Sequence, residues 1–520
     1  MHMTRYRRVP TFGRGTIRRF HKNASAMKRL AARDFEDLLQ ASEKSSSQLN
    51  LTHWTIQCAI PVFEGLLPDQ HNNIMLNLLF DLATWHAFAK LRLHTEQTLE
   101  LFDAATNYLG CSIRKFERTT CRYYHTTELP QEHAVRGRRT AALSAKQGHA
   151  IPPATSRPKQ KKLNLHTYKF HALGDYVDTI RMFGTTDNYT TQTVSTWSAS
   201  FFLLLDGCQG ELEHRRVKRR FPRSGKKKEH TVKSIANQDA IERFVRKVDN
   251  TRRNLSLQRQ PESQPRRTRT SPSDHYSIAQ TSRKIDSLTS WLRRHTNDPA
   301  FVVSLHCLSL TLLTNLQDFL PRLKDHLLAR ARGLAYDGDE HTFSDSDRGC
   351  VNIKDDRIYH HSLLRVNYTT YDLRREQDTI NPLTRADIMV LSHEDERTHP
   401  YWYARVIDIF HVMVQHRADE TSAFLPPERM NVLFVRWFRR DMNYPSGWSE
   451  KRLHRLQFFD QENSLDAFGF LDPDCVVRGV HLIPAFGYFR TSDLLGVSRA
   501  RRKPDGEDPH ADWKYYYVNM

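Results

Sequence analysis

Between residues 72 and 116, apolar side chains recur every three or four positions and no proline interrupts them. That period is typical of amphipathic helices, because it gathers the apolar side chains on one face. Pro68 and Asp69 provide a helix start, and we expect Gly110 to end the run. The pattern therefore predicts a helical subdomain, to which we assign residues 31–135.

Two shorter helical patterns follow, and each is closed by a glycine. The first runs over residues 165–183 and ends at Gly184, and the second runs over residues 319–332 and ends at Gly333. Glycine readily adopts the left-handed backbone that closes many helices, so both positions fit helix C-termini.

The C-terminal third of the chain changes to a strand pattern. Short runs rich in β-branched and aromatic residues alternate with clusters of Pro, Gly and Asp, as is typical of strands separated by turns. We predict a sheet or a small, partly closed barrel of about five strands. The runs are Asp387–Leu391, Trp402–Phe410, Asn431–Phe438, Cys475–Val480 and His481–Phe486.

Alternation along these strands predicts which side chains fill the interior. We expect Val406, Ile407 and Phe410 to point inward. Arg405 and Arg436 are expected to point outward. Aromatic side chains at strand spacing are typical of a core, with contact to histone or DNA as the alternative. The aromatic positions assigned to the core are Trp402, Tyr403, Trp437 and Phe438.

The composition favours a polyanionic partner. The 520 residues include 78 Lys and Arg against 59 Asp and Glu, a formal charge of +19, and nucleic acid is the first candidate. Residues 211–270 alone hold 19 basic and seven acidic residues. The seven cysteines form no C-x-x-C pair, which fits a reducing compartment. No apolar run reaches the roughly 18 residues of a membrane helix, so we expect no membrane partner.

The helical and strand patterns together predict an α+β multidomain protein. The hydrophobic content of 39% excludes a wholly disordered chain. We expect the N-terminal segment to be a disordered basic arm. The alternative is a segment that contacts phosphates or directs nuclear import. The segments are a basic arm over 1–30, the helical subdomain over 31–135, a basic linker over 136–163, a region with a basic helix over 164–259, a disordered linker over 260–283, a helical or irregular connector over 284–380, and a β-rich domain over 381–520.

Several stretches together resemble a known family. RDFEDLLQ, ATWHAFAKLRLHTE, YKFHALGDYVDTIRMFGTTDNYTTQ, GELEHRRVKR and PYWYARVIDIF are similar to the C-terminal half of Plavaka-type transposases. These are DDE enzymes of cut-and-paste elements from basidiomycete fungi, related to the CACTA type. The resemblance implies that residues 31–135 are a helical insertion and that residues 164–259 hold the end of an RNase H-like region. It also implies a nuclear protein.

In DDE transposases two Asp and one Glu hold two Mg²⁺ ions for DNA strand transfer. The resemblance makes Glu211 the candidate third carboxylate and metal ligand, because it opens a basic helix after a Phe-Gly turn. The alternative is a solvated helix in which Glu211 pairs with Arg215 and Arg216. The cations expected to contact double-stranded DNA are Arg215, Arg216, Lys218, Arg219, Arg220, Arg223, Lys226, Lys227 and Lys228.

The family carries its two catalytic Asp upstream of the segment RDFEDLLQ, which begins only about thirty residues into this chain. We therefore expect a truncated transposase that binds DNA but holds no Mg²⁺ and does not cut. Glu211 would be a metal ligand only if upstream Asp residues were supplied.

Three segments interrupt the family pattern, namely residues 41–57, 194–209 and 303–317. Each begins with Ala-Ser or Val-Ser, which can be encoded by a splice-donor sequence. Each ends with Gln, which can be encoded by a splice-acceptor sequence. We hypothesise that they are short introns retained in frame, with genuine loops or core strands as the alternative. The genomic codons decide between these interpretations.

Near the C-terminus, the W-x-A-R-V and V-R-W-F runs are similar to the opening of a bromo-adjacent-homology (BAH) domain, a strand-rich chromatin module. This leaves two alternatives to the transposase fragment. One is a chromatin-associated protein that acts through the BAH-like domain over residues 381–520. The other is a pseudogene product with retained introns.

Overall fold

The computed structural model describes residues 2–12, 17, 54–128, 133–139, 158–160, 162–186, 274–295, 298, 319–334, 341–392, 399–419, 421–459, 467–495, 498, 500 and 512–519. Internal contacts divide the chain into one unit of residues 1–43, 49–179 and 274–520 and another of residues 44–48 and 180–273. The packing described below lies within the first unit. In the described ranges, no helix is long and apolar enough to cross a membrane.

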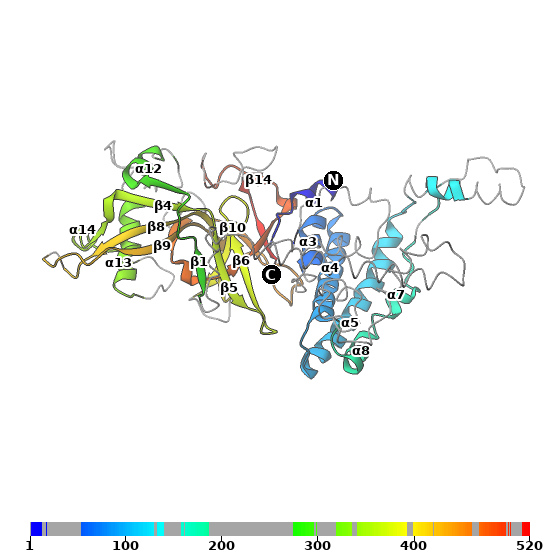
Figure 1. Cartoon of the computed structure of the whole chain (residues 1–520). Helices are drawn as coiled ribbons and strands as arrows, with labels where there is room; N and C mark the ends of the chain where they lie inside the picture. Colours follow the sequence, from blue (N-terminus) through cyan, green and yellow to red (C-terminus); the bar gives the residue numbers. More distant parts are fainter. Residues whose placement is uncertain are drawn as a thin grey trace, which may run out of the picture. The chain divides into compact units, whose positions relative to one another are not determined.

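The helices confirm the period found between residues 72 and 116, which forms most of α4 and α5 (Figure 1). The α-helices are α1 (His2–Arg8), α3 (Trp54–Phe63), α4 (Asp69–Lys90), α5 (Glu96–Phe116), α7 (Tyr168–His171), α8 (Tyr176–Phe183), α12 (Leu288–Arg294), α13 (Phe319–Ala331) and α14 (Asp345–Arg348). A π-helix, η2 (Glu117–Cys121), continues α5 directly, and short 3₁₀ turns occupy η5 (Lys354–Asp356), η7 (Pro473–Cys475) and η8 (Phe486–Tyr488).

The break between α4 and α5 lies at Thr95, and the expectation that Gly110 ends the run is wrong. The Thr95 hydroxyl accepts the Thr98 N–H at 3.2 Å, and the Thr98 hydroxyl accepts the Thr95 N–H at 2.8 Å, which is a capping box that starts α5. Gly110 lies inside α5. A glycine in a helix interior costs only about 1 kcal/mol, and the fully buried Leu109 beside it offsets this.

The core between α4 and α5 is aromatic. Phe102 is fully buried, and its ring centroid lies 5.8 Å from that of Phe88 and 5.5 Å from that of Trp85. Tyr176, at the start of α8, packs edge-on against Trp85 at 4.9 Å. The predicted helix end at Gly184 is confirmed, because α8 stops at Phe183 and Gly184 has a φ of 82°.

The strands form a large antiparallel region, which makes the fold α+β (Figure 1). One sheet has eleven strands in the described residues, with the order β12-β7-β8-β9-β10-β16-β13 and with β11, β2, β3 and β4 attached to it. Two smaller sheets pair β1-β5-β6 and β14-β15. The strands are β1 (Tyr276–Ile278), β2 (Lys284–Ser287), β3 (Val351–Ile353), β4 (Arg357–His361), β5 (Leu364–Thr369), β6 (Arg375–Ile380), β7 (Asp387–Leu391), β8 (Tyr401–His416), β9 (Glu428–Arg440), β10 (Arg455–Phe458), β11 (Phe468–Leu471), β12 (Val476–Gly479), β13 (His481–Pro484), β14 (Arg490–Thr491), β15 (Asp512–Trp513) and β16 (Tyr516–Asn519).

All five predicted runs contain strands, namely β7, β8, β9, β12 and β13. The β region, however, begins at Tyr276, inside the predicted disordered linker. It continues through residues 284–380, which the sequence pattern assigns to a helical or irregular connector. Strands β5 and β6 carry exposed charges at Arg365 and Arg375, so their composition does not resemble that of a buried strand.

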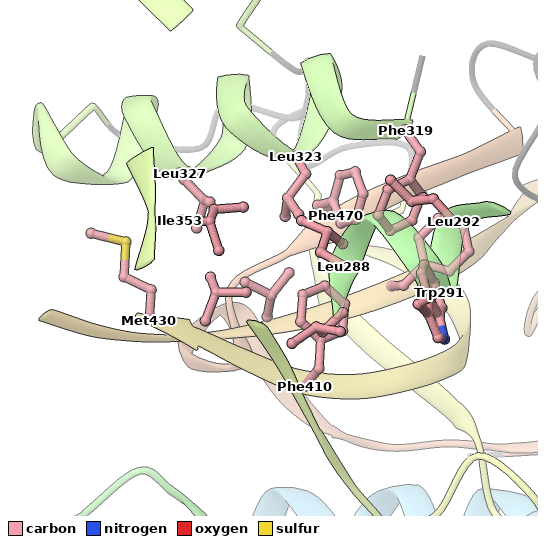
Figure 2. Close-up of a cluster of buried hydrophobic side chains, with 14 of the residues drawn as sticks. Leu288, Trp291, Leu292, Phe319, Leu323, Leu327, Ile353, Phe410, Met430 and Phe470 are labelled. Carbon is pink, nitrogen blue, oxygen red and sulfur yellow. The ribbon is translucent and has the colours of Figure 1, made fainter. Parts of the chain in front are cut away.

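Helices α12 and α13 supply one side of the main apolar core (Figure 2). Leu323 and Leu327 of α13 are fully buried against the sheet. The Phe319 ring lies 4.9 Å from that of Phe470 and 5.3 Å from that of Phe434. These contacts attach α13, a confirmed helix, to the face formed by β9 and β11.

The N-terminal residues differ from the predicted disordered arm wherever the structure describes them. Arg5 Nη1 donates to the carbonyl oxygen of Val62 at 3.0 Å. His481 Nε2 donates to the Pro10 carbonyl oxygen at 2.9 Å, and Val9 is buried. Apolar side chains interspersed among the arginines therefore hold residues 2–12 in place, although the charge pattern alone predicts disorder.

The two arginines expected to face outward are buried instead. Arg405 and Arg436 are directly opposite each other on β8 and β9, and they expose 5% and 1% of their surface. Val406 and Phe410 are buried as predicted, and Ile407 is half-buried. Both faces of the sheet are covered here, so strand alternation does not separate interior from exterior. Of the predicted core aromatics, Tyr403 and Phe438 are buried and Trp402 and Trp437 are half-buried.

Candidate nucleic-acid interface

The residues that the sequence assigns to DNA or metal binding lie outside the described residues. These are Glu211 and the cations Arg215, Arg216, Lys218, Arg219, Arg220, Arg223, Lys226, Lys227 and Lys228. The same holds for segments 194–209 and 303–317 and for most of 41–57, of which residues 54–57 open α3. These assignments stay predictions.

The described residues hold a second basic surface, on the helical subdomain. Three arginines are distributed along the end of the helical segment: Arg114 lies in the last turn of α5, Arg118 lies in η2, and Arg122 comes directly after η2. They are spaced four residues apart, so they lie along one side of the helix, and all three are exposed. Together with neighbouring cations they form what we call the basic helical surface: Arg114, Lys115, Arg118, Arg122, Arg138, Arg139, Lys159 and Lys162.

Hydrogen bonds attach the more distant segments of this surface to Thr127 and Glu128, six and seven residues beyond the end of η2. The Glu128 N–H donates to the carbonyl oxygen of Lys159 at 2.9 Å, and Thr127 forms a β-bridge with Gln160. The helical segment 133–139, which carries Arg138 and Arg139, is fastened where the Arg136 Nε donates to Glu128 Oε1 at 2.9 Å. Part of the predicted basic linker is therefore built onto the helices.

The electrostatic field of this surface is strongly positive. The described residues between positions 114 and 162 include nine Lys or Arg and two Glu. Glu128 is buried, and the hydrogen bonds from Arg136 hold the pKa of its carboxyl below the usual range. Glu117 lies 3.9 Å from Arg122, whose side chain remains 70% exposed. Both acids therefore have a cationic partner, and the other cations extend into solvent, where they attract polyanions.

Three rings form an aromatic cluster next to Arg122, with tilted and edge-on contacts. Tyr123 follows Arg122 directly and is 65% exposed. Its ring centroid lies 4.6 Å from that of His71 and 5.0 Å from that of Tyr124. His71 is itself buried and lies within hydrogen-bond distance of the Thr120 hydroxyl, at 3.2 Å. The ring of Tyr123, two residues beyond η2, is thus supported from α4 by His71 while most of it faces solvent.

Comparison with protein-family models, with curated proteins and with solved structures finds no match.

A second cluster places a serine beside a histidine, but it does not form a catalytic triad. The Ser446 hydroxyl lies 3.0 Å from His454 Nδ1, and the His454 ring lies 4.5 Å from that of His399. His399 Nε2 is 2.9 Å from the Tyr403 hydroxyl. Across the described ranges, no carboxylate hydrogen-bonds to either histidine, so the group that orients the base in a triad is missing.

The described residues also hold no group of three or more His, Cys, Asp or Glu side chains placed to bind a metal ion. Glu211, a metal ligand only if upstream Asp residues are supplied, lies outside them, so the expectation that this chain holds no Mg²⁺ stays a prediction.

The basic helical surface was only partly predictable from the sequence. Arg138, Arg139, Lys159 and Lys162 belong to the stretch predicted as a basic linker. Arg114, Arg118 and Arg122 had only their four-residue spacing as a signal, because the sequence pattern ends the predicted helix at Gly110, before all three. The sequence gives no signal for the position of the Tyr123 ring, because this position depends on a contact with His71, 52 residues earlier in the chain.

Proposed function

We propose that this protein binds DNA, and that the basic helical surface is one of its contact regions. The observation that carries the proposal is the gathering of exposed cations along α5, η2 and the two segments fastened to them. Phosphate groups supply most of the affinity in such contacts, because each neutralised phosphate releases counterions. The predicted cations between Arg215 and Lys228 would add a second contact region.

We also propose that the chain derives from a Plavaka-type DDE transposase and acts in the nucleus. This part depends on the resemblance of the sequence stretches and their order. The α4–α5 helices would then be the helical insertion, and residues 381–520 the BAH-like module. Glu211 keeps its proposed role as the third carboxylate, which would bind metal only if upstream Asp residues were supplied, and the alternative, in which it pairs with Arg215 and Arg216, also stands.

The experiment is a titration of the full chain against a labelled duplex of about 20 base pairs at several salt concentrations. If about six cations contact phosphates, log K falls with log salt with a slope near −5. Changing Arg114, Arg118 and Arg122 together to Gln removes three of these contacts. The slope should then become shallower by about 3, and the affinity at low salt should drop.

The matched control removes three exposed cations from the β region instead. Lys354, Arg357 and Arg365 are exposed, and changing them to Gln alters the net charge by the same amount. The proposal predicts that this variant keeps the slope of the unaltered chain. Equal effects of the two triple variants, or binding that does not depend on salt, would show that the basic helical surface is not a DNA contact region.

A further inference from the structure

We propose that Tyr123 is a stacking site for an unpaired DNA base, so that the basic helical surface prefers single-stranded DNA to duplex DNA. This inference rests on the proposed function, because the base must be delivered by a strand whose phosphates meet the cations. Proteins that hold single strands combine a positively charged track with aromatic rings on which bases stack. Both features are present at this position.

The geometry favours Tyr123 as the stacking ring. Its side chain is 65% exposed, although the ring packs against His71 at 4.6 Å and Tyr124 at 5.0 Å. His71 is 7% exposed and lies 3.2 Å from the Thr120 hydroxyl, so the support beneath the ring is itself fixed. A ring held in this way loses little conformational freedom when a base stacks on it.

The surrounding charges favour the same ligand. Arg118 and Arg122 belong to the same continuous helix as Tyr123, within one to two turns. The hydrogen bond from the Glu128 N–H to the carbonyl oxygen of Lys159 attaches a second cationic segment five residues beyond Tyr123. Cations before and after Tyr123 in the chain are therefore available to the phosphates of a strand whose base stacks on the ring. In a duplex the bases are already stacked inside the helix, so the ring has no accessible base face to contact.

The π-helix η2 sets the position of the ring. The five residues Glu117–Cys121 form a π-turn between α5 and Tyr123, which changes the direction in which the following side chains leave the helix. Thr120, inside this turn, is the residue that lies next to His71. The turn and its histidine support thus place the ring beside the arginine row.

The test compares a single-stranded oligonucleotide of about 15 nucleotides with its duplex, each titrated against the full chain. Changing Tyr123 to Ala should weaken binding of the single strand roughly 5- to 150-fold, the range for loss of one base–aromatic stack. It should leave duplex binding and the salt slope of both ligands unchanged, because no phosphate contact is lost. Tyr123→Phe and Tyr123→Trp should keep or improve single-strand binding, which a damaged fold would not do.

Tyr168→Ala is the matched control, because Tyr168 on α7 is 81% exposed and lies outside the basic helical surface. It should change neither affinity. If Tyr123→Ala weakens both ligands equally, or if Tyr123→Trp binds the single strand as poorly as Tyr123→Ala, the stacking site is refuted. The triple variant of Arg114, Arg118 and Arg122 tests the proposed DNA binding separately. Failure of the stacking site can therefore be distinguished from failure of DNA binding.

Discussion

The ion pair of Arg436 and Asp512 should stabilise the β region only while both charges are present. Arg436 Nη1 donates to Asp512 Oδ2 at 2.8 Å, and the two side chains are 1% and 5% exposed. The guanidinium carbon lies 3.6 Å from the centre of the Phe458 ring. Burial lowers the pKa of this arginine and Asp512 counteracts the shift, but a guanidinium remains charged near neutral pH.

Changing Asp512 to Asn should therefore leave a buried, uncompensated cation. Removing one partner of a buried pair typically costs about 3–5 kcal/mol. The ring of Phe458 still faces the guanidinium, so we expect the lower end, about 3 kcal/mol. The assay is urea denaturation of the full chain, followed by circular dichroism. The free energy follows from the shift in midpoint multiplied by the slope of the transition.

The control pair is Arg332 and Asp347, which lie 2.7 Å apart but are 38% and 37% exposed. Asp347→Asn should cost less than about 1 kcal/mol, because water replaces the lost partner of an exposed cation. Replacing the buried pair together, as Arg436→Met with Asp512→Leu, should restore most of the stability. The reasoning would be refuted if Asp512→Asn destabilised the protein no more than Asp347→Asn does.

Two further predictions concern the pH dependence of stability and the helical core. His361 Nε2 and His411 Nδ1 lie 2.7 Å apart, and burial, then Arg429, lowers both pKa values to about 4. Since the unfolded histidines bind protons near pH 6.5, stability should fall as the pH drops from 6.5 to about 4. Changing His361 and His411 together to Phe should flatten this pH dependence in urea denaturation. Phe102→Ala should cost about 3–5 kcal/mol and lower the helical circular-dichroism signal, whereas the exposed Tyr108→Ala on the same helix should not.

The helices and the longest strands were predictable because local patterns determine them. The apolar period between residues 72 and 116 gives α4 and α5, and the β-branched runs give β8 and β9. The shorter strands of residues 276–380 were missed, because β5 and β6 carry charged residues between the few apolar side chains that they bury, such as Leu364 and Ile380. The docking of residues 2–12 was missed because its hydrogen-bond partners are distant in the sequence: Val62 lies 57 positions from Arg5, and His481 lies 471 positions from Pro10.

The buried arginines could not be predicted, because each depends on an acid that only the fold brings near. Arg436 pairs with Asp512, 76 residues later, and Arg405 pairs with Asp387 on the neighbouring strand at 2.6 Å. Both cations also face the ring of Phe458. The expectation that charged side chains of a strand face solvent fails where a carboxylate neutralises the charge and aromatic rings cover it.

These pairs also change what the net charge means for DNA binding. Arg405 and Arg436 contribute to the formal charge of +19, but each is neutralised by a carboxylate in the core and cannot meet a phosphate. Arg136 is likewise engaged with Glu128. Affinity and its salt dependence follow the number of cations that actually reach phosphates, not the total. Removing Arg114, Arg118 and Arg122 should therefore weaken DNA binding far more than removing three exposed cations of the β region, although both changes lower the net charge equally.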